Sequence, residues 1–279
     1  MTSKQRLDLE LVARGLVASR QQAQQLIRAG LVRSGDQVLD KPGTEVRPHT
    51  PLQVQEQPRF VSRGGDKLAA ALEGFALPVL GRICLDGGIS TGGFSDCLLQ
   101  AGASLIYGID VGYGQTAWTL RNDPRVVLKE RTNLRHLTAE GLFSPGAPRP
   151  DLAVADVSFI GLALVLPALL GLMRPLAEAG RRDLVLLVKP QFEVGRERVG
   201  KGGVVRDPIA HRQAIEGVIT AAQVLGLAAG GLMASPITGP AGNHEYLLWL
   251  QPQQALNPDQ LVTTEAIADL VDQTLSTRT

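Results

Sequence analysis

The residues best suited to chemistry are three acids and a lysine that each follow a short apolar run. Asp86, Asp110 and Asp156 end three such runs, and Lys189 follows the run 183–188. Runs of this kind are typical of buried parallel strands. Because ligands of open α/β sheets bind beyond the carboxyl ends of the strands, we expect these four side chains to share one edge of a sheet. A lysine in that position is unusual, since lysine is almost never fully buried unless it is paired.

A glycine-rich turn follows the first of these acids and precedes a helical pattern. Its candidate ligand-binding residues are Gly88, Ser90, Gly92 and Gly93. Glycine lets a backbone approach a ligand closely, and a helix start offers unpaired N–H groups. The spacing differs from the Gly-x-Gly-x-x-Gly of dinucleotide binders, and Asp86 would repel a pyrophosphate. The turn suits a cationic or hydroxyl-bearing ligand such as the amino-acid end of S-adenosylmethionine, and a plain tight turn is the alternative.

Asp110 and Asn133 extend this candidate ligand site. Asp110 lies about twenty residues past the turn, where a carboxylate can accept both hydroxyls of a ribose. Asn133 follows the third strand-like run, at 125–130. It either caps the next turn or borders an adenine pocket.

The rest of the sequence predicts the elements that position these residues. Strand-like runs at 82–85, 105–110, 125–130, 151–156 and 183–188 alternate with helical patterns. Such alternation predicts a parallel sheet with helices on both faces. The apolar segment 160–173 is too short to span a membrane and is expected to be a buried helix. Glu245 begins the last strand, so it reaches the same edge only if that strand is antiparallel.

The N-terminal region has the pattern of a separate small module. Two short helices, the second capped by Ser19 and Gln22, precede a hairpin at 31–39. Residues 1–67 carry a net charge of +4 and the remainder carries −3. A basic module suggests a nucleic-acid partner, although a merely solvated charged surface is the alternative. The candidate RNA-facing residues are Arg6, Arg14, Arg20, Arg28, Arg33 and Lys41.

This module resembles the alpha-L RNA-binding domain first seen in ribosomal protein S-four. The resemblance rests on Arg6-Leu7-Asp8, Arg14-Gly15, Ser19-Arg20 and Ala29-Gly30, together with Ala23, Ile27 and Val32. Domains of this kind hold structured RNA mainly by shape and backbone charge.

Further motifs carry a resemblance over nearly the full length. The main ones are Val61–Leu68, Ser90–Phe94, Asp110–Gln115, Asp156–Ile160, Val188–Glu193, Gly200–Asp207 and Ser235–Pro240. In these the chain resembles the TlyA family, described both as hemolysins and as ribosomal RNA 2′-O-methyltransferases. The resemblance implies an α/β fold, with a Rossmann-like, FtsJ-like methyltransferase at 68–279 whose mostly parallel sheet has an antiparallel last strand. It also implies a small α+β alpha-L domain at 1–58 and a linker at 59–67.

The family resemblance also implies a reaction and its residues. The reaction is S-adenosylmethionine-dependent 2′-O-methylation of cytidine ribose in ribosomal RNA within ribosomal subunits. FtsJ-like enzymes use a Lys-Asp-Lys-Glu tetrad, which falls here on Lys67, Asp156, Lys189 and Glu245. The cofactor-binding residues carried over are Asp86, Gly88, Ser90, Gly92, Gly93, Asp110, Asn133 and Asp156.

The chemistry explains why the tetrad needs these residue types. A ribose hydroxyl must lose its proton as the methyl group transfers, and a lysine accepts it if neighbours and burial lower the lysine pKa. We expect Lys189 to be the base and Lys67 to lower its pKa. Asp156 would orient Lys189, and Glu245 would position Lys67 or the ribose.

Two positions depart from the family's usual cofactor loop, Asp-Val-Gly-Ala-Ser-Thr-Gly-Gly. This chain has Gly87 and Ile89 at the second and fourth positions. Gly87 is expected to loosen the turn, and Ile89 to add bulk near the methionine end of the cofactor. An RNA-binding ribosome assembly factor with an inert methyltransferase fold is therefore one alternative function.

A membrane-lytic hemolysin is the other alternative. The sequence shows neither a membrane span nor a signal-peptide pattern, so we expect a cytoplasmic protein without stable membrane insertion. Cys84 and Cys97 form no disulfide framework, which fits a reducing compartment. The four histidines are scattered and suggest no metal site. The oligomeric state does not follow from the sequence.

Overall fold

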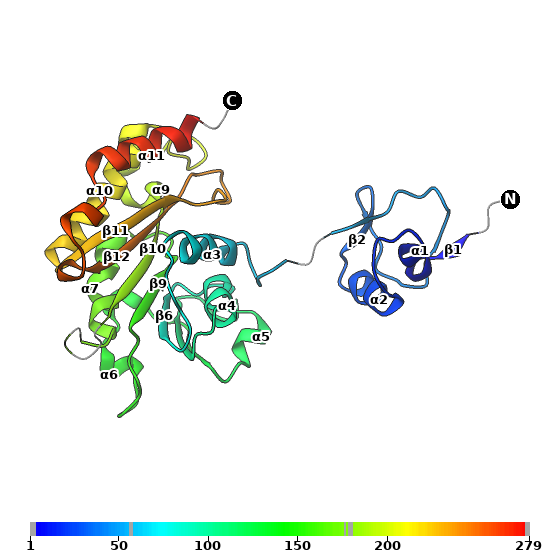
Figure 1. The fold of residues 1–279 in the computed structure, drawn as a ribbon, viewed down its shortest axis with the longest axis horizontal. Helices are drawn as coiled ribbons and strands as arrows, with labels where there is room; N and C mark the ends of the chain where they lie inside the picture. Colours follow the sequence, from blue (N-terminus) through cyan, green and yellow to red (C-terminus); the bar gives the residue numbers. More distant parts are fainter. Residues whose placement is uncertain (1–3, 56–57, 176, 178–180, 277–279) are drawn as a thin grey trace. The chain divides into compact units, whose positions relative to one another are not determined.

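The chain forms two compact units, which divide between Arg59 and Phe60. The computed structural model describes residues 4–55, 58–175, 177 and 181–276 (Figure 1). Unit 1 precedes the division and unit 2 follows it.

Unit 1 consists of short strands around two helices. Its elements are β1 (Gln5–Arg6), α1 (Leu7–Ala13), α2 (Arg20–Arg28), β2 (Val32–Ser34), β3 (Gln37–Val38), β4 (Glu45–Val46) and β5 (Gln53–Val54). β2 pairs antiparallel with β3 and with β5, so the predicted hairpin is confirmed. Ser19 accepts the N–H of Gln22 and caps α2, as expected. Leu7 and Leu11 of α1 pack with Ile27 of α2 in the core of this unit.

Unit 2 is built on a seven-stranded sheet in the order β11-β12-β10-β9-β6-β7-β8. The strands are β6 (Ile83–Gly87), β7 (Leu105–Ile109), β8 (Val126–Lys129), β9 (Leu152–Ala155), β10 (Asp183–Val188), β11 (Leu227–Ala234) and β12 (Tyr246–Pro252). The strands from β10 to β8 are parallel, and β12 is antiparallel to both β10 and β11. The expected sheet with an antiparallel last strand is therefore confirmed.

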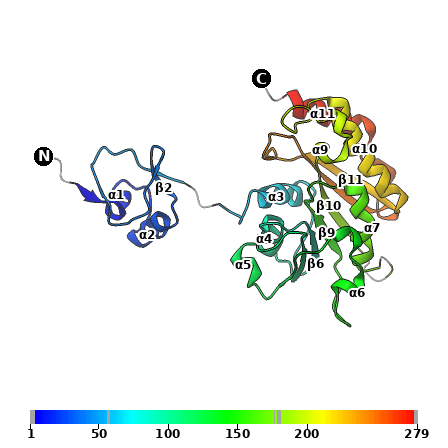
Figure 2. The ribbon, with the colours of Figure 1, turned by 180° about the vertical axis from the view of Figure 1, so that it is seen from behind.

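Helices cover both faces of this sheet (Figures 1 and 2). One face carries α3 (Gly64–Gly74), α4 (Gly93–Gln100) and α5 (Trp118–Arg121), and the other carries α7 (Leu162–Leu172), α10 (Pro208–Val224) and α11 (Thr264–Ser276). Shorter helical segments are η1 (Leu134–His136), α6 (Ala139–Leu142), α9 (Pro190–Glu193), η2 (Arg196–Arg198), η3 (Gln253–Ala255) and η4 (Pro258–Gln260). Each face has its own apolar core. The first core includes residues of α3, α4 and α5, and the second includes residues of α7, α10 and α11, among them Ile267 and Val271 of α11. No helix in the described part of the chain has the length and apolar character that a membrane crossing requires.

The structure differs from the linker expected at 59–67. Phe60 is buried in the first core, and α3 begins at Gly64, inside the range expected to be linker. The helix backbone passes so close to Phe60 that a Cβ at Gly65 would lie 2.2 Å from its Cγ. Because glycine permits this approach, the first turn of α3 packs directly against Phe60, within the range expected to be linker. Lys67 is consequently buried within α3 and does not precede it.

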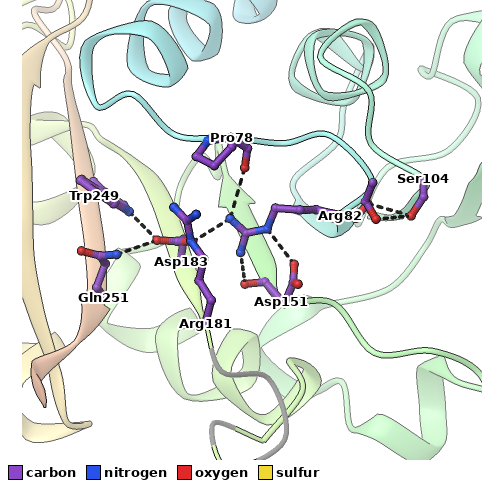
Figure 3. Close-up of polar contacts among 9 residues, drawn as sticks. Pro78, Arg82, Ser104, Asp151, Arg181, Asp183, Trp249 and Gln251 are labelled. Atoms are coloured by element: carbon purple, nitrogen blue, oxygen red, sulfur yellow. Dashed lines mark hydrogen bonds and ion pairs between the residues drawn. The ribbon is translucent and has the colours of Figure 1, made fainter. Parts of the chain in front are cut away.

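A buried ionic network joins several strands at the end of the sheet opposite Lys189 (Figure 3). Arg82 donates from Nη1 to Asp183 at 2.7 Å and from Nε to Asp151 at 2.9 Å. The second oxygen of Asp183 accepts from Trp249 Nε1 and Gln251 Nε2, both at 2.9 Å. Buried charges are tolerated only when they are paired and hydrogen-bonded. The network therefore balances the buried negative charge of Asp183 at the start of β10 and links this residue to β12.

Candidate active site

The strand ends bring the predicted chemical residues to one edge of the sheet. Asp110, Asp156 and Lys189 directly follow β7, β9 and β10, and Asp86 lies near the end of β6. Glu245 directly precedes β12, which runs against β10 with Tyr246 opposite Val188. The start of β12 therefore lies at the same edge as the end of β10.

Four side chains at this edge form two ion pairs. Lys189 Nζ lies 2.6 Å from Asp156 Oδ1 and donates to Ser158 Oγ at 2.8 Å. Lys67 Nζ donates to Glu245 Oε2 at 2.5 Å. The side chains of both lysines and of Glu245 are no more than 10% exposed. Because water screens such buried pairs poorly, each lysine is held in a defined position.

Two cavities meet at the same edge. The first, of about 340 Å³, is lined by Gly88, Ser90, Asp110, Asn133 and Asp156 together with neighbouring residues. The second, of about 260 Å³, is lined by all four ion-pair residues and by Gly93. Gly88, Ser90, Asp156 and Ser158 line both cavities. A molecule in the first cavity can therefore reach the residues of the second across this shared wall.

The glycine-rich turn builds the shared wall. Gly88 has a φ of +86°, and a Cβ there would lie 2.8 Å from the carbonyl oxygen of Asp156. The backbone N–H of Ser90 donates to Asp110 Oδ2 at 2.8 Å, and that of Gly112 donates to Oδ1 at 2.6 Å. A carboxylate has about four acceptor positions, so Asp110 keeps capacity for ligand hydroxyls.

Two known families match separate segments of the chain. Residues 60–252 match the FtsJ-like methyltransferase family, and residues 5–51 match the S4 domain. The 16S/23S rRNA (cytidine-2′-O)-methyltransferase TlyA of Mycobacterium tuberculosis is 50% identical over 278 residues, which is 99% of each chain. The chain belongs to the TlyA family of FtsJ-like methyltransferases.

Other TlyA-like relatives include proteins named as hemolysins. Hemolysin A of Brachyspira hyodysenteriae is 37% identical over 242 residues, covering 87% of this chain and 98% of the relative. The solved structure "Putative hemolysin from Streptococcus thermophilus" matches with a TM-score of 0.72 at 39% identity, covering 99% of this chain and 97% of that chain.

Two of the cofactor residues expected from the TlyA resemblance line neither cavity. Asp86 is 0% exposed, its Oδ2 accepts from Ser95 Oγ at 2.6 Å, and its Oδ1 has no hydrogen-bond partner among the described residues. Burial, together with the charges of Asp156 and Asp110, raises the pKa of Asp86 to about 7. Gly92 has a φ of +101° and precedes α4. Both residues therefore lie behind the cavity walls.

Asn133 caps a short helix and also lines a cavity. Its Oδ1 accepts the N–H of Arg135 at 3.0 Å and so caps η1. It also lines the first cavity. The capping bond fixes the side chain at the cavity rim.

Sequence interpretation missed Ser158 and Phe159. Ser158 accepts a hydrogen bond from Lys189, and Phe159 lines the first cavity. Phe159 is 91% exposed with a φ of +65°, a strained conformation for a bulky residue that often marks functional sites. The available signal was their position directly after Asp156, in a motif that carries the TlyA resemblance.

The two departures from the usual TlyA cofactor loop are accommodated by their neighbours. A Cβ at Gly87 would lie 2.7 Å from a methyl group of Leu134, so the leucine occupies that space. Ile89 is 3% exposed and packs over Gly108, where a Cβ would lie 2.5 Å from Ile89 Cδ1. The turn is closely packed at both positions, in contrast to the looser turn expected from Gly87.

Three of the arginines expected to face RNA hold unit 1 together. Arg6 and Arg20 pair with the buried Asp8 at 3.1 and 3.0 Å. The hydrogen bond from Arg6, with smaller contributions from Gln24 and Arg20, holds the pKa of Asp8 well below its usual range. Arg14 pairs with Glu10 at 2.7 Å and also donates to three backbone carbonyl oxygens at 47–50. Intramolecular partners thus engage these guanidinium groups.

The remaining three candidates in unit 1 are different. Arg28 and Lys41 are exposed and Arg33 is partly exposed. Within the described residues, none of the three forms an ion pair. Their charges are therefore available to a partner.

Proposed function

We propose that this chain transfers a methyl group from S-adenosylmethionine to the ribose 2′-hydroxyl of cytidines in ribosomal RNA. The observation that carries the proposal is the pair of cavities with a common wall, one containing Asp110 and the other containing two lysine–carboxylate pairs. The name of the Mycobacterium tuberculosis relative supports cytidine in ribosomal RNA as the substrate. A ribosomal substrate also supports a cytoplasmic location for the reaction, which is part of this proposal.

The residues of the first cavity fit S-adenosylmethionine. Asp110 would accept the ribose hydroxyls, and Asn133 would border the adenine. Gly88 and Ser90 would leave the backbone open to the methionine end, with Asp86 and Gly92 supporting the turn from behind. The volume of about 340 Å³ lies within the usual range for ligand pockets. When bound, the cofactor supplies the electrophilic methyl group.

Lys189 would accept the proton of the 2′-hydroxyl. A neutral lysine amine has two hydrogens and one lone pair, and Asp156 and Ser158 both lie within hydrogen-bonding distance of it. The hydrogen bond to Ser158 and the ion pair with Asp156 would turn the lone pair of the amine toward the hydroxyl in the second cavity. Asp156 and Ser158 would thus orient the base.

Lys67 and Glu245 would position the ribose. Their 2.5 Å contact holds a positive charge at the wall of the second cavity. A fixed cation stabilises the negative charge that develops on the hydroxyl oxygen as its proton leaves. In unit 1, Arg28, Arg33 and Lys41 would contact RNA phosphates.

The test is transfer of labelled methyl from S-adenosylmethionine to purified ribosomal subunits, followed by digestion to nucleosides. The wild-type chain should label the ribose of cytidine. Lys189→Met should lower the rate by about 10² to 10⁴-fold while the cofactor Kd stays the same. Lys129→Met is the matched control, because Lys129 donates to the carbonyl oxygen of Gly141 and lines neither cavity.

Two results would contradict the proposal. Folded wild-type protein that labels neither subunit would favour an RNA-binding factor with an inert methyltransferase fold. Equal loss of activity in Lys189→Met and Lys129→Met would remove Lys189 as the base.

A further inference from the structure

Glu245 is flanked along the chain by buried polar residues that the mechanism above does not use. Asn243 is 2% exposed and Tyr246 is 0% exposed. The loop between β11 and β12 also closes around Glu245, since a Cβ at Gly239 would lie 2.6 Å from its Oε1. Burying polar groups is costly unless they are hydrogen-bonded, so the partners of Asn243 and Tyr246 matter.

Both flanking residues connect to the backbone of one residue, Val205. Its N–H donates to Asn243 Oδ1 at 3.0 Å, and Asn243 Nδ2 donates to the carbonyl oxygen of Gly203 at 2.8 Å. The carbonyl oxygen of Val205 lies 3.0 Å from His211 Nε2, and His211 Nδ1 lies 2.9 Å from the Tyr246 hydroxyl. Val205 is thus bonded to residue 243 directly and to residue 246 through His211.

These partners determine the tautomer of His211. A carbonyl oxygen can only accept, so Nε2 carries the hydrogen and Nδ1 accepts from the Tyr246 hydroxyl. Burial lowers the pKa of His211 and so favours this neutral form. His211 is 0% exposed within α10, so the connection from Val205 to Tyr246 is anchored in a packed helix.

The chain before Val205 forms a glycine-rich basic loop, residues 196–203, that contains Arg196, Arg198 and Lys201. Gly202 and Gly203 have φ values of +81° and +77°, which allow the loop to turn back on itself. The loop borders a third cavity of about 790 Å³, which Phe159 also lines. Because Phe159 lines the first cavity as well, the basic loop lies beside the proposed cofactor site.

We propose that Asn243 and His211 are positioning residues that fix Glu245 to the basic loop 196–203. Neither side chain lines the first or the second cavity, so both act through the backbone on either side of Glu245. A displacement of Val205 moves residues 243 and 246 together and with them the Lys67–Glu245 pair. This inference rests on the proposed function, because it gives the Lys67–Glu245 pair a catalytic role.

Two tyrosines provide a matched pair of variants. Tyr246→Phe deletes the hydroxyl that bonds His211, whereas Tyr107→Phe deletes a hydroxyl that donates to the carbonyl oxygen of Pro148 at 2.9 Å. Both tyrosines are buried and neither lines the first or second cavity. Asn243→Ala removes the direct bond to Val205. Asn243→Asp keeps that acceptor but loses the donor to Gly203.

Four quantities are measured on the full chain: kcat and KM with ribosomal subunits, the Kd of S-adenosylmethionine, and amide hydrogen exchange of the peptide containing Val205. Asn243→Ala should lower kcat by about 10 to 100-fold, because a small misplacement of a positioned group is costly to the rate. The cofactor Kd should stay within about twofold, and exchange at Val205 should accelerate. Tyr246→Phe should change kcat in the same direction, Asn243→Asp should restore part of the loss, and Tyr107→Phe should match the wild type.

Several outcomes would overturn the inference. Wild-type kcat in Asn243→Ala is one, unchanged exchange at Val205 is another, and an equal kcat loss in Tyr107→Phe and Tyr246→Phe is a third. Absence of methyl transfer by the wild-type chain would instead contradict the proposed function. In that case, faster exchange at Val205 in Asn243→Ala would still support the connection to the loop, and unchanged exchange would refute it.

Discussion

Asp86→Asn is expected to stabilise unit 2 by an amount that grows as the pH rises. The Asp86 side chain is 0% exposed, and burial raises its pKa from 3.8 to about 7. Its hydrogen bond from Ser95 opposes that rise but does not cancel it. Asparagine has nearly the same shape, keeps an acceptor for Ser95 and carries no charge. The variant therefore removes the cost of ionising a buried carboxyl group.

The direction of the effect follows from proton binding. Between the two pKa values the folded state holds a proton on Asp86 that the unfolded chain has released, so the free energy of unfolding falls as pH rises. Asp86 contributes this stability fully below pH 3.8 and loses it as the pH rises through about 7. A difference of about three pH units, at about 1.4 kcal/mol each, amounts to about 4 kcal/mol.

Urea unfolding followed by tryptophan fluorescence measures the effect in the right unit, because both tryptophans, Trp118 and Trp249, lie in unit 2. The stability of Asp86→Asn relative to wild type should rise by about 3 kcal/mol between pH 5 and pH 8. Other titrating groups, such as Glu193 with a pKa raised by burial to about 7, cancel in the difference. Asp259→Asn, at an exposed position, is the control. A difference that stays constant over this pH range would refute the burial argument.

Three further predictions concern other parts of the fold. Gly88→Ala should weaken S-adenosylmethionine binding at least about tenfold by calorimetry, because its Cβ would lie 2.8 Å from a backbone carbonyl oxygen at a φ of +86°. Arg82→Met should lower the unfolding free energy of unit 2 by about 3–5 kcal/mol, because it removes a buried charge partner of Asp183. In the same urea assay, adding Asp183→Asn to this variant should recover part of the lost unfolding free energy. Arg14→Ala should lower the melting temperature of unit 1, because Arg14 donates to backbone carbonyl oxygens within it. Arg28→Ala, at an exposed position, should leave that melting temperature unchanged and weaken RNA retention on filters. Equal melting temperatures in the two variants would contradict the assigned roles.

Much of the site could be predicted because local sequence patterns have long-range consequences in a parallel sheet. An apolar run followed by Asp110, Asp156 or Lys189 predicts a strand with that residue at its carboxyl end. Every parallel strand places its carboxyl end at the same edge, so the shared position of these residues required no knowledge of side-chain packing. The antiparallel last strand came from the family resemblance, since the apolar pattern of β12 does not specify its direction.

The sequence alone therefore determined the order of elements, the sheet edge that carries the chemistry and the types of residues placed there. Only the tertiary structure decided which of those side chains face a cavity. Asp86 lies near the end of one strand and Asp156 directly follows another, yet Asp86 is buried behind the wall while Asp156 contacts Lys189. The partner of Lys67 is 178 residues away, at Glu245. Such outcomes depend on burial and on contacts between distant segments, which exist only once the chain has folded and therefore leave no local signal in the sequence.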